Sequence, residues 1–208
     1  MINKRITKST VNKTQNTVKK TQSAIKKTQS SRKIGFSASN FKKMVHAAQR
    51  SLNSQKSVVI SQTRTISTDS SWVNALPINR NPSWVAPQAG ESYLWGKNDP
   101  NGPAAVVARR FTILRDVDEI DDATLFLAVD NFAIVLINGR ALIIDSPQAN
   151  SSFFNPGRQF DIVPFLRRGR NDIVIAAFNF PSNSNRSDNN PAGVLARIRI
   201  NFAQQSKK

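Results

Sequence analysis

Apolar and polar positions alternate along the second half of the chain, in short runs divided by turn residues. The alternation is clearest at Leu125, Leu127 and Val129, and a period of two is typical of a strand with one buried face. From Glu91 onward helical periodicity is absent, and seven or eight strands are expected from eight candidate runs. They span Ser92–Trp95, Ala105–Leu114, Thr124–Val129, Ala133–Ile137, Ala141–Ile144, Gln159–Val163, Asp172–Phe178 and Val194–Phe202. Strands at this spacing predict an all-β sandwich or jelly roll.

Three local signals refine this prediction. Asn138-Gly139 lies between two apolar runs and predicts a type I′ hairpin turn, which needs positive φ at both central positions. Asp130-Asn131 predicts another tight turn. In the last run the apolar residues shift by one position between Leu195 and Ile198, which predicts a β-bulge.

The first third of the chain has a different pattern. Three copies of a seven-residue unit begin at Val11, Val18 and Ile25. In a coiled coil these residues would fill one core position, but threonine would fill the other, and no lysine would have an acidic partner. The pattern therefore favours a solvated, low-complexity and largely disordered cationic segment over an ordered coil.

Residues 40–52 form a candidate short amphipathic helix. Apolar side chains recur there at spacings of three and four, and Ser39 is placed to cap the helix. We expect the apolar face to dock on the folded domain or on a neighbouring subunit, with an in-plane membrane helix as the weaker alternative. Residues 58–60 then predict a short strand. The apolar positions of the helix are Phe41, Met44, Val45, Ala48 and Leu52.

Charge divides the chain more sharply than hydropathy does. The 208 residues carry a formal net charge of +17. Residues 1–68 hold 15 of the 30 Lys and Arg residues and none of the 13 acids, so the remainder carries only +2. We therefore predict a basic arm at 1–68 and a folded domain at 69–208, which is long enough to fold alone.

An arm with this charge is expected to bind a polyanion such as nucleic acid, teichoic acid or anionic lipid, because each neutralised anion releases counterions. Sequence-specific recognition is not expected, because the arm contains no helix-turn-helix, zinc finger or aromatic-rich surface. The predicted polyanion-binding residues are Lys4, Arg5, Lys8, Lys13, Lys19, Lys20, Lys26, Lys27, Arg32, Lys33, Lys42 and Lys43.

Six segments between about residues 72 and 202 carry a resemblance to a known family of β-sandwich modules. They are Arg109–Phe111, Ala123–Asn131, Val135–Gly139, Phe160–Ile162, Leu166–Ile173 and Pro191–Leu195. In their order and spacing these segments resemble the galactose-binding-like modules that are appended to many glycoside hydrolases. The resemblance implies a galactose-binding-like sandwich whose ligand contacts come from variable loops at one end, and it supplies no sugar-binding motif that matches this chain position by position.

Two polar loops are candidate recognition loops, Gly96–Gly102 and Pro181–Pro191. Either could also be a solvated connection or supply oxygen ligands to calcium, although neither has EF-hand spacing. Trp72 and Trp84 could stack on a sugar, but packing in the sandwich is the favoured interpretation. The predicted ligand-binding residues are Trp95, Asn98, Asp99, Arg186, Asp188 and Asn189, and we predict no resident metal or other cofactor.

Catalysis has little support in the sequence. The chain has no cysteine, and its one histidine, His46, lies in the predicted helix without an obvious partner. The acidic cluster between two strands is interpreted as a solvated loop or as a docking surface for the arm of another subunit, in preference to a paired-carboxylate active site. Its members are Asp116, Asp118, Glu119, Asp121 and Asp122.

Two hypotheses remain. The first is a non-enzymatic structural or binding protein, whose sandwich recognises a glycan or a protein neighbour within an assembly while the arm binds a polyanion. The second is a coat or capsid protein whose arm neutralises packaged nucleic acid. Both imply self-assembly or a homo-oligomer. The absence of a signal-peptide pattern and of cysteine predicts synthesis in the cytoplasm, and the absence of long apolar runs predicts no transmembrane insertion. Both hypotheses are compatible with a place in a virion or another layered assembly.

Overall fold

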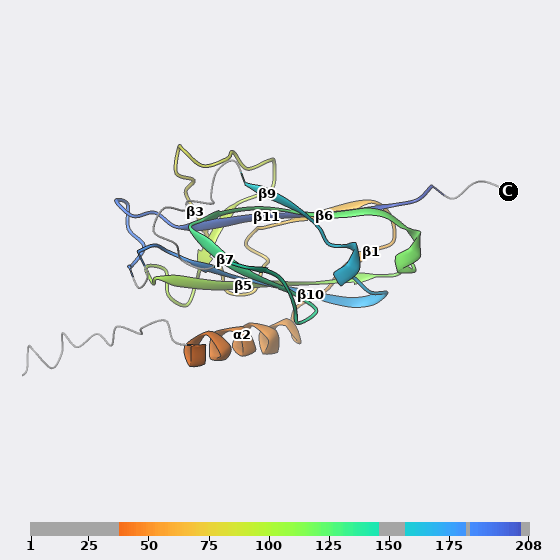
Figure 1. Cartoon of the computed structure of the whole chain (residues 1–208), viewed down its shortest axis with the longest axis horizontal. Helices are drawn as coiled ribbons and strands as arrows, with labels where there is room; N and C mark the ends of the chain where they lie inside the picture. The colour runs from red at the N-terminus through yellow and green to blue at the C-terminus, as the bar shows by residue number, and fades with distance from the viewer. Residues whose placement is uncertain (1–37, 146–156, 182–183, 205–208) are drawn as a thin grey trace, which may run out of the picture. The chain divides into compact units, whose positions relative to one another are not determined.

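The computed structural model describes residues 38–145, 157–181 and 184–204. The chain divides into two units after Gly35, and every described residue belongs to the second unit, Phe36–Lys208. This unit consists of two packed β-sheets and the helix α2 (Ala38–Leu52) (Figure 1). The predicted all-β sandwich is therefore confirmed.

The two sheets, named here sheet A and sheet B, have different strand orders. Most neighbouring strands are antiparallel, but β1 pairs with β5 in parallel. Sheet A has the order β1 (Val58–Ile60), β5 (Ala104–Ile113), β10 (Gly169–Phe178), β7 (Phe132–Ile137), β8 (Arg140–Ile144). Sheet B has the order β3 (Ala75–Ile78), β4 (Tyr93–Gly96), β11 (Gly193–Phe202), β6 (Ile120–Asp130), β9 (Arg158–Asp161), and β2 (Arg64–Ser67) also pairs with β11.

All eight candidate runs after residue 91 form strands, although β6 and β10 begin earlier than predicted. Asn138 and Gly139 have φ of 52° and 79°, so the hairpin turn between β7 and β8 has the predicted positive φ at both positions. The chain also turns at Asp130-Asn131, between β6 and β7. Two 3₁₀ turns complete the elements, η1 (Val117–Glu119) and η2 (Val163–Phe165).

The bulge predicted between Leu195 and Ile198 is wrong. The register of β11 on β6 runs without a shift from Gly193 to Asn201, and the irregularity lies after Asn201. Leu195 is buried on the outer face of sheet B, where it packs in one cluster with Trp84. The alternation breaks because this part of β11 is buried on both faces.

The central strands of sheet A are also buried on both faces. Val107 of β5 and Ile175 of β10 belong to the core between the sheets. Their neighbours Val106 and Val174 belong to a second cluster beneath α2. Such strands have continuous apolar runs because neither face meets water. The remaining members of the second cluster are Val45, Ala48, Leu52, Ala108 and Ala176.

The helix predicted at 40–52 is confirmed as α2, and its apolar face docks on the chain's own sandwich. The domain boundary predicted near residue 68 is wrong, because α2, β1 and β2 all belong to the folded unit. Thr68 itself is fully buried, and its N–H donates to the carbonyl oxygen of Ala196 at 2.9 Å. The change in charge near residue 68 marks the end of the acid-free segment, and the fold begins before it.

Candidate binding surfaces

The two predicted recognition loops lie against each other. The backbone N–H of Arg186 in the second loop donates to the carbonyl oxygen of Asn101 in the first at 3.0 Å. Residues 182 and 183 of the second loop lie outside the described residues. The structure therefore brings together two loops that are far apart along the chain and that the sequence identified only one by one.

Trp95 does not belong to that surface. Its side chain is fully buried in the core, and its indole N–H donates to the carbonyl oxygen of Gly102 at 3.2 Å. Trp72 and Trp84 are buried as well. Trp95 is therefore removed from the predicted ligand-binding residues, because a buried ring presents no face to a sugar. Among the described residues no Trp, Tyr or Phe side chain is exposed.

The other predicted ligand residues separate into two groups. Arg186 and Asp188 line a hollow of about 390 Å³ that also includes Arg80, Asn79 and Asn81. Two of its guanidinium groups already bind backbone. Arg80 donates to the carbonyl oxygens of Pro82 and Trp84, and Arg186 donates to that of Ala192. The hollow thus offers guanidinium, carboxamide and carboxylate groups that form hydrogen bonds.

Asn98, Asp99 and Asn189 are exposed and do not line this hollow. The N–H of Asn98 donates to the side-chain oxygen of Asn74 at 2.8 Å, which fixes the start of its loop. Within the described ranges no three His, Cys, Asp or Glu residues are grouped so that they could hold a metal ion. The calcium alternative therefore gains no support from this surface.

The predicted polyanion-binding residues are divided by the limits of the described chain. Lys42 and Lys43 lie exposed on α2, whereas the ten predicted residues from Lys4 to Lys33 lie outside the described residues. Sequence analysis missed two polar companions on this helix, His46 and Arg50, which are also exposed. His46 and Arg50 follow Lys42 at successive intervals of four residues, and this spacing was the available signal, because residues i and i+4 share one helix face.

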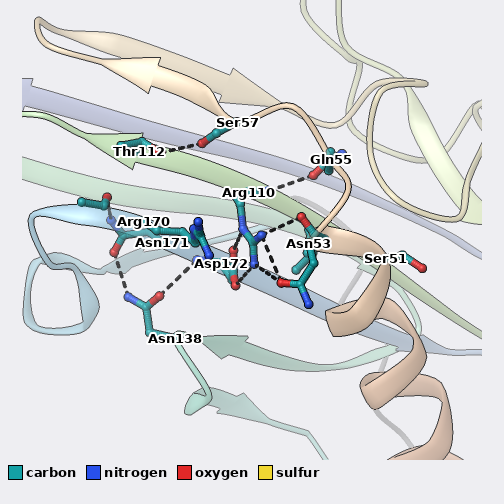
Figure 2. A network of polar contacts seen from close by, with 12 residues as sticks. Ser51, Asn53, Gln55, Ser57, Arg110, Thr112, Asn138, Arg170, Asn171 and Asp172 are labelled. Atoms are coloured by element: carbon teal, nitrogen blue, oxygen red, sulfur yellow. Dashed lines mark hydrogen bonds and ion pairs between the residues drawn. The ribbon is translucent and has the colours of Figure 1, made fainter.

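A polar network fixes the end of α2 to sheet A (Figure 2). Arg110 of β5 donates to both carboxylate oxygens of Asp172 on β10, at 2.6 and 2.7 Å. The same guanidinium donates to the carbonyl oxygen of Leu52 at 2.7 Å and to the side-chain oxygen of Asn53. It therefore satisfies a carbonyl group at the helix end that has no partner within the helix. The hydrogen bond and charge of Asp172 raise the pKa of Arg110, against the effect of burial.

This network borders a hollow of about 380 Å³ between the end of α2 and the β7–β8 turn. Arg50 and His46 line it from the helix, and Arg167 lines it from the segment before β10. Asp172 is the one acid in the lining and is paired with Arg110. With three arginines against one carboxylate, the hollow has an excess of positive charge.

The acidic loop is exposed and partly neutralised. Asp116 accepts a hydrogen bond from Arg168 at 2.9 Å, and Glu119 pairs with Arg115 at 2.6 Å. The hydrogen bond from Arg115 holds the pKa of Glu119 below its usual value. Asp118 and Asp121 are exposed. Docking of another subunit's arm on this loop stays a prediction.

Comparison with known proteins finds a likeness to solved structures but none at the level of sequence. No family profile and no curated protein matches the sequence. The chain is similar to the alpha-L-rhamnosidase of Streptomyces avermitilis complexed with L-rhamnose, with 21% identity and a TM-score of 0.44, over 64% of this chain and 13% of that one.

Two smaller structures show the same kind of likeness. A family 35 carbohydrate binding module from an environmental isolate is 14% identical, with a TM-score of 0.38, over 68% of this chain and 99% of that one. Another from Clostridium thermocellum is 13% identical, with a TM-score of 0.35, over 65% and 97%. The strand pairings described above carry the assignment of the sandwich.

Proposed function

We propose that this chain is a non-enzymatic structural or binding protein, in which the basic arm binds a polyanion and the sandwich is the rigid body that the arm attaches to an assembly. The observation that carries the proposal is the segregation of charge: residues 1–35, which precede the folded unit and are called the arm from here on, hold ten basic and no acidic residues. A segment of this kind binds phosphate or other anionic groups along a polymer without reading a sequence.

Nucleic acid is the polyanion that we favour. Binding by many dispersed lysines gains free energy chiefly from counterion release, and a nucleic acid has the high linear charge density that this requires. One of the hypotheses from the sequence, a coat protein with packaged nucleic acid, uses the same property of the arm in an assembled shell. Among the described residues the first to pack against a core cluster is Phe41.

The sandwich could also recognise a glycan or a protein neighbour, and the hollow beside Arg186 and Asp188 favours this second role. In that hollow the recognition of a glycan would rest on hydrogen bonds from Arg, Asn and Asp side chains, because the described surface has no exposed aromatic ring. A glycan array that retains the wild-type protein but not an Asp188→Ala variant supports this role. No binding by the wild type contradicts it.

The test of the main proposal is size-exclusion chromatography with light scattering and absorbance at 260 and 280 nm, at low and high salt. The full chain and residues 36–208 are compared. We expect the full chain to carry nucleic acid at low salt and lose it at high salt, and the shortened chain to carry little. A large particle supports the coat protein, whereas a small oligomer supports a tethered binding module. Equal nucleic acid content in both proteins contradicts the proposal.

A further inference from the structure

The exposed side of α2 is a cationic strip that the fold does not use. Lys42, His46 and Arg50 follow one another at intervals of four residues and therefore share a face of the helix. From the first to the last of them the helix rises about 12 Å. The apolar side chains Val45, Ala48 and Leu52 occupy the other side, against sheet A. The basic side chains are thus free to meet a ligand without disturbing the packing.

The strip continues into the hollow at the end of α2. Arg50 lines the hollow together with Arg167, which comes from the segment before β10. The Nε–H of Arg167 donates to the carbonyl oxygen of Arg170 at 2.8 Å, which holds the base of the guanidinium group in place. Two arginines from distant parts of the chain therefore face one concave surface.

Neither arginine is neutralised by the protein. Among the described residues the five ion pairs do not include Lys42, Arg50 or Arg167. The carboxylate nearest in the hollow, Asp172, already accepts both of its short hydrogen bonds from Arg110. Figure 2 shows this pair beside Asn53 at the end of the helix. The pair supports the wall of the hollow, while the positive charge of the strip remains without a partner.

We infer that the cationic strip, defined as Lys42, Arg50 and Arg167 with His46 between the first two, binds the phosphate groups of a nucleic acid strand whose adjoining part is held by the arm. This inference rests on the proposed function and assigns it an ordered contact surface. Guanidinium groups bind phosphate in a two-pronged geometry, which suits them to backbone contacts. The described surface offers no exposed aromatic ring on which a base could stack, so the strip contacts the backbone and not the bases.

The test is the salt dependence of binding to a fluorescent single-stranded oligothymidylate, measured by anisotropy with the full-length chain. The test variant is Arg50→Gln with Arg167→Gln. The matched control is Arg64→Gln with Arg199→Gln, which removes the same charge from exposed positions on β2 and β11 of sheet B. Loss of two phosphate contacts should reduce the magnitude of the slope of the logarithm of the binding constant against the logarithm of salt concentration by about 1.4. The control should leave this slope nearly unchanged.

Different outcomes would contradict the role of the strip and the proposed function of the arm. If the slopes are equal for the test variant and the wild type, or are reduced equally in the test and control variants, the strip does not contact the phosphates. The arm then remains the binding element. A wild-type chain that does not bind the oligonucleotide overturns the proposed function together with the strip. If the test variant loses binding to a sulfated polysaccharide but not to the oligonucleotide, the ligand class is wrong. Thermal unfolding of each variant shows that the fold is retained.

Discussion

The two sheets of the sandwich are covered on their outer faces in two different ways. Sheet A is covered by a regular helix, α2, whose buried side chains are aliphatic. Sheet B is covered by the irregular segment between β3 and β4, which places Trp84 in one cluster with Tyr93 of β4, Ala128 and Leu195. Both covers keep apolar strand residues from water, but they distribute polar groups in opposite ways.

The helix separates its polar and apolar groups to opposite sides, so the outer side is available for charge. The cover of sheet B instead contains polar groups. The indole N–H of Trp84 donates to a carboxylate oxygen of Asp130 at 3.0 Å, and the hydroxyl of Tyr93 donates to the carbonyl oxygen of Val85 at 3.1 Å. Burial raises the pKa of Asp130 to about 6 and that of Tyr93 to about 12.

The comparison shows that two kinds of cover can bury the apolar outer face of a sheet with different consequences for function. A helix placed over a sheet leaves a ready surface for ligands, and the side chains that α2 buries in its cluster with sheet A carry no titratable group. A loop with buried polar groups fixes particular side chains, but it makes stability depend on pH. We therefore expect binding variants to map to the cover of sheet A and pH effects to the cover of sheet B.

The largest effect is expected from Trp84→Ala. The change removes a buried ring that is packed against Tyr93 at 4.8 Å between centroids, and it leaves Asp130 without its indole donor. We expect the free energy of unfolding in urea to fall by about 4 kcal/mol. Trp84→Phe is the control, since it keeps a ring but loses the N–H. If alanine and phenylalanine cost the same, the hydrogen bond and not the packing fixes this cover.

The next largest loss in the free energy of unfolding is expected from Leu52→Ala. Leu52 is fully buried between the end of α2 and sheet A, so its removal leaves a cavity. The expected loss in the free energy of unfolding is about 3 kcal/mol. Ser51→Ala, on the exposed side of the same turn, should change it by less than about 0.5 kcal/mol. Equal effects at the two positions would show that α2 is not a stabilising cover.

The smallest of the three effects on the free energy of unfolding is expected from Asp130→Asn, and this change should stabilise the protein. The raised pKa means that the folded protein holds the Asp130 proton more tightly than the unfolded chain, so stability is lost as pH rises from about 4 through 6. Asparagine cannot ionise, and the variant should be more stable at pH 7 by about 2 kcal/mol after allowance for solvent screening.

Thermal unfolding across that pH range measures the effect. The matched control is Asp121→Asn on the same strand, because Asp121 is exposed. It should leave the pH profile of the wild type unchanged. A wild-type profile that is flat between pH 4 and 6 would show that Asp130 is not the source of pH dependence.

The sequence predicted most of the fold because the long strands have one or two continuous apolar faces. It missed β2 and β3, which are short and contain few buried side chains. Residues Arg64–Ser67 have one buried side chain, Ile66, and Ala75–Ile78 include Pro77. These strands are held by pairing with β11 and β4, and no local pattern shows such pairing in advance.

The candidate sites were predicted less well than the fold. Arg186 and Asp188 could be placed in one loop because they are close in sequence, but their meeting with Arg80 depends on the tertiary structure. Trp95 was misplaced because an indole ring serves packing and sugar stacking equally well in sequence. The Arg50 and Arg167 pair joins residues that are far apart along the chain, and only the docking of α2 on sheet A brings them together.

The pairing of β2 with β11 also sets the order in which the chain can fold. Thr68 is hydrogen-bonded to Ala196 through both its backbone and its side chain, although 128 positions separate them. Contacts at such separation form slowly because a long loop must close first. During synthesis β2 therefore cannot form its pairing until β11, the last strand, has been made.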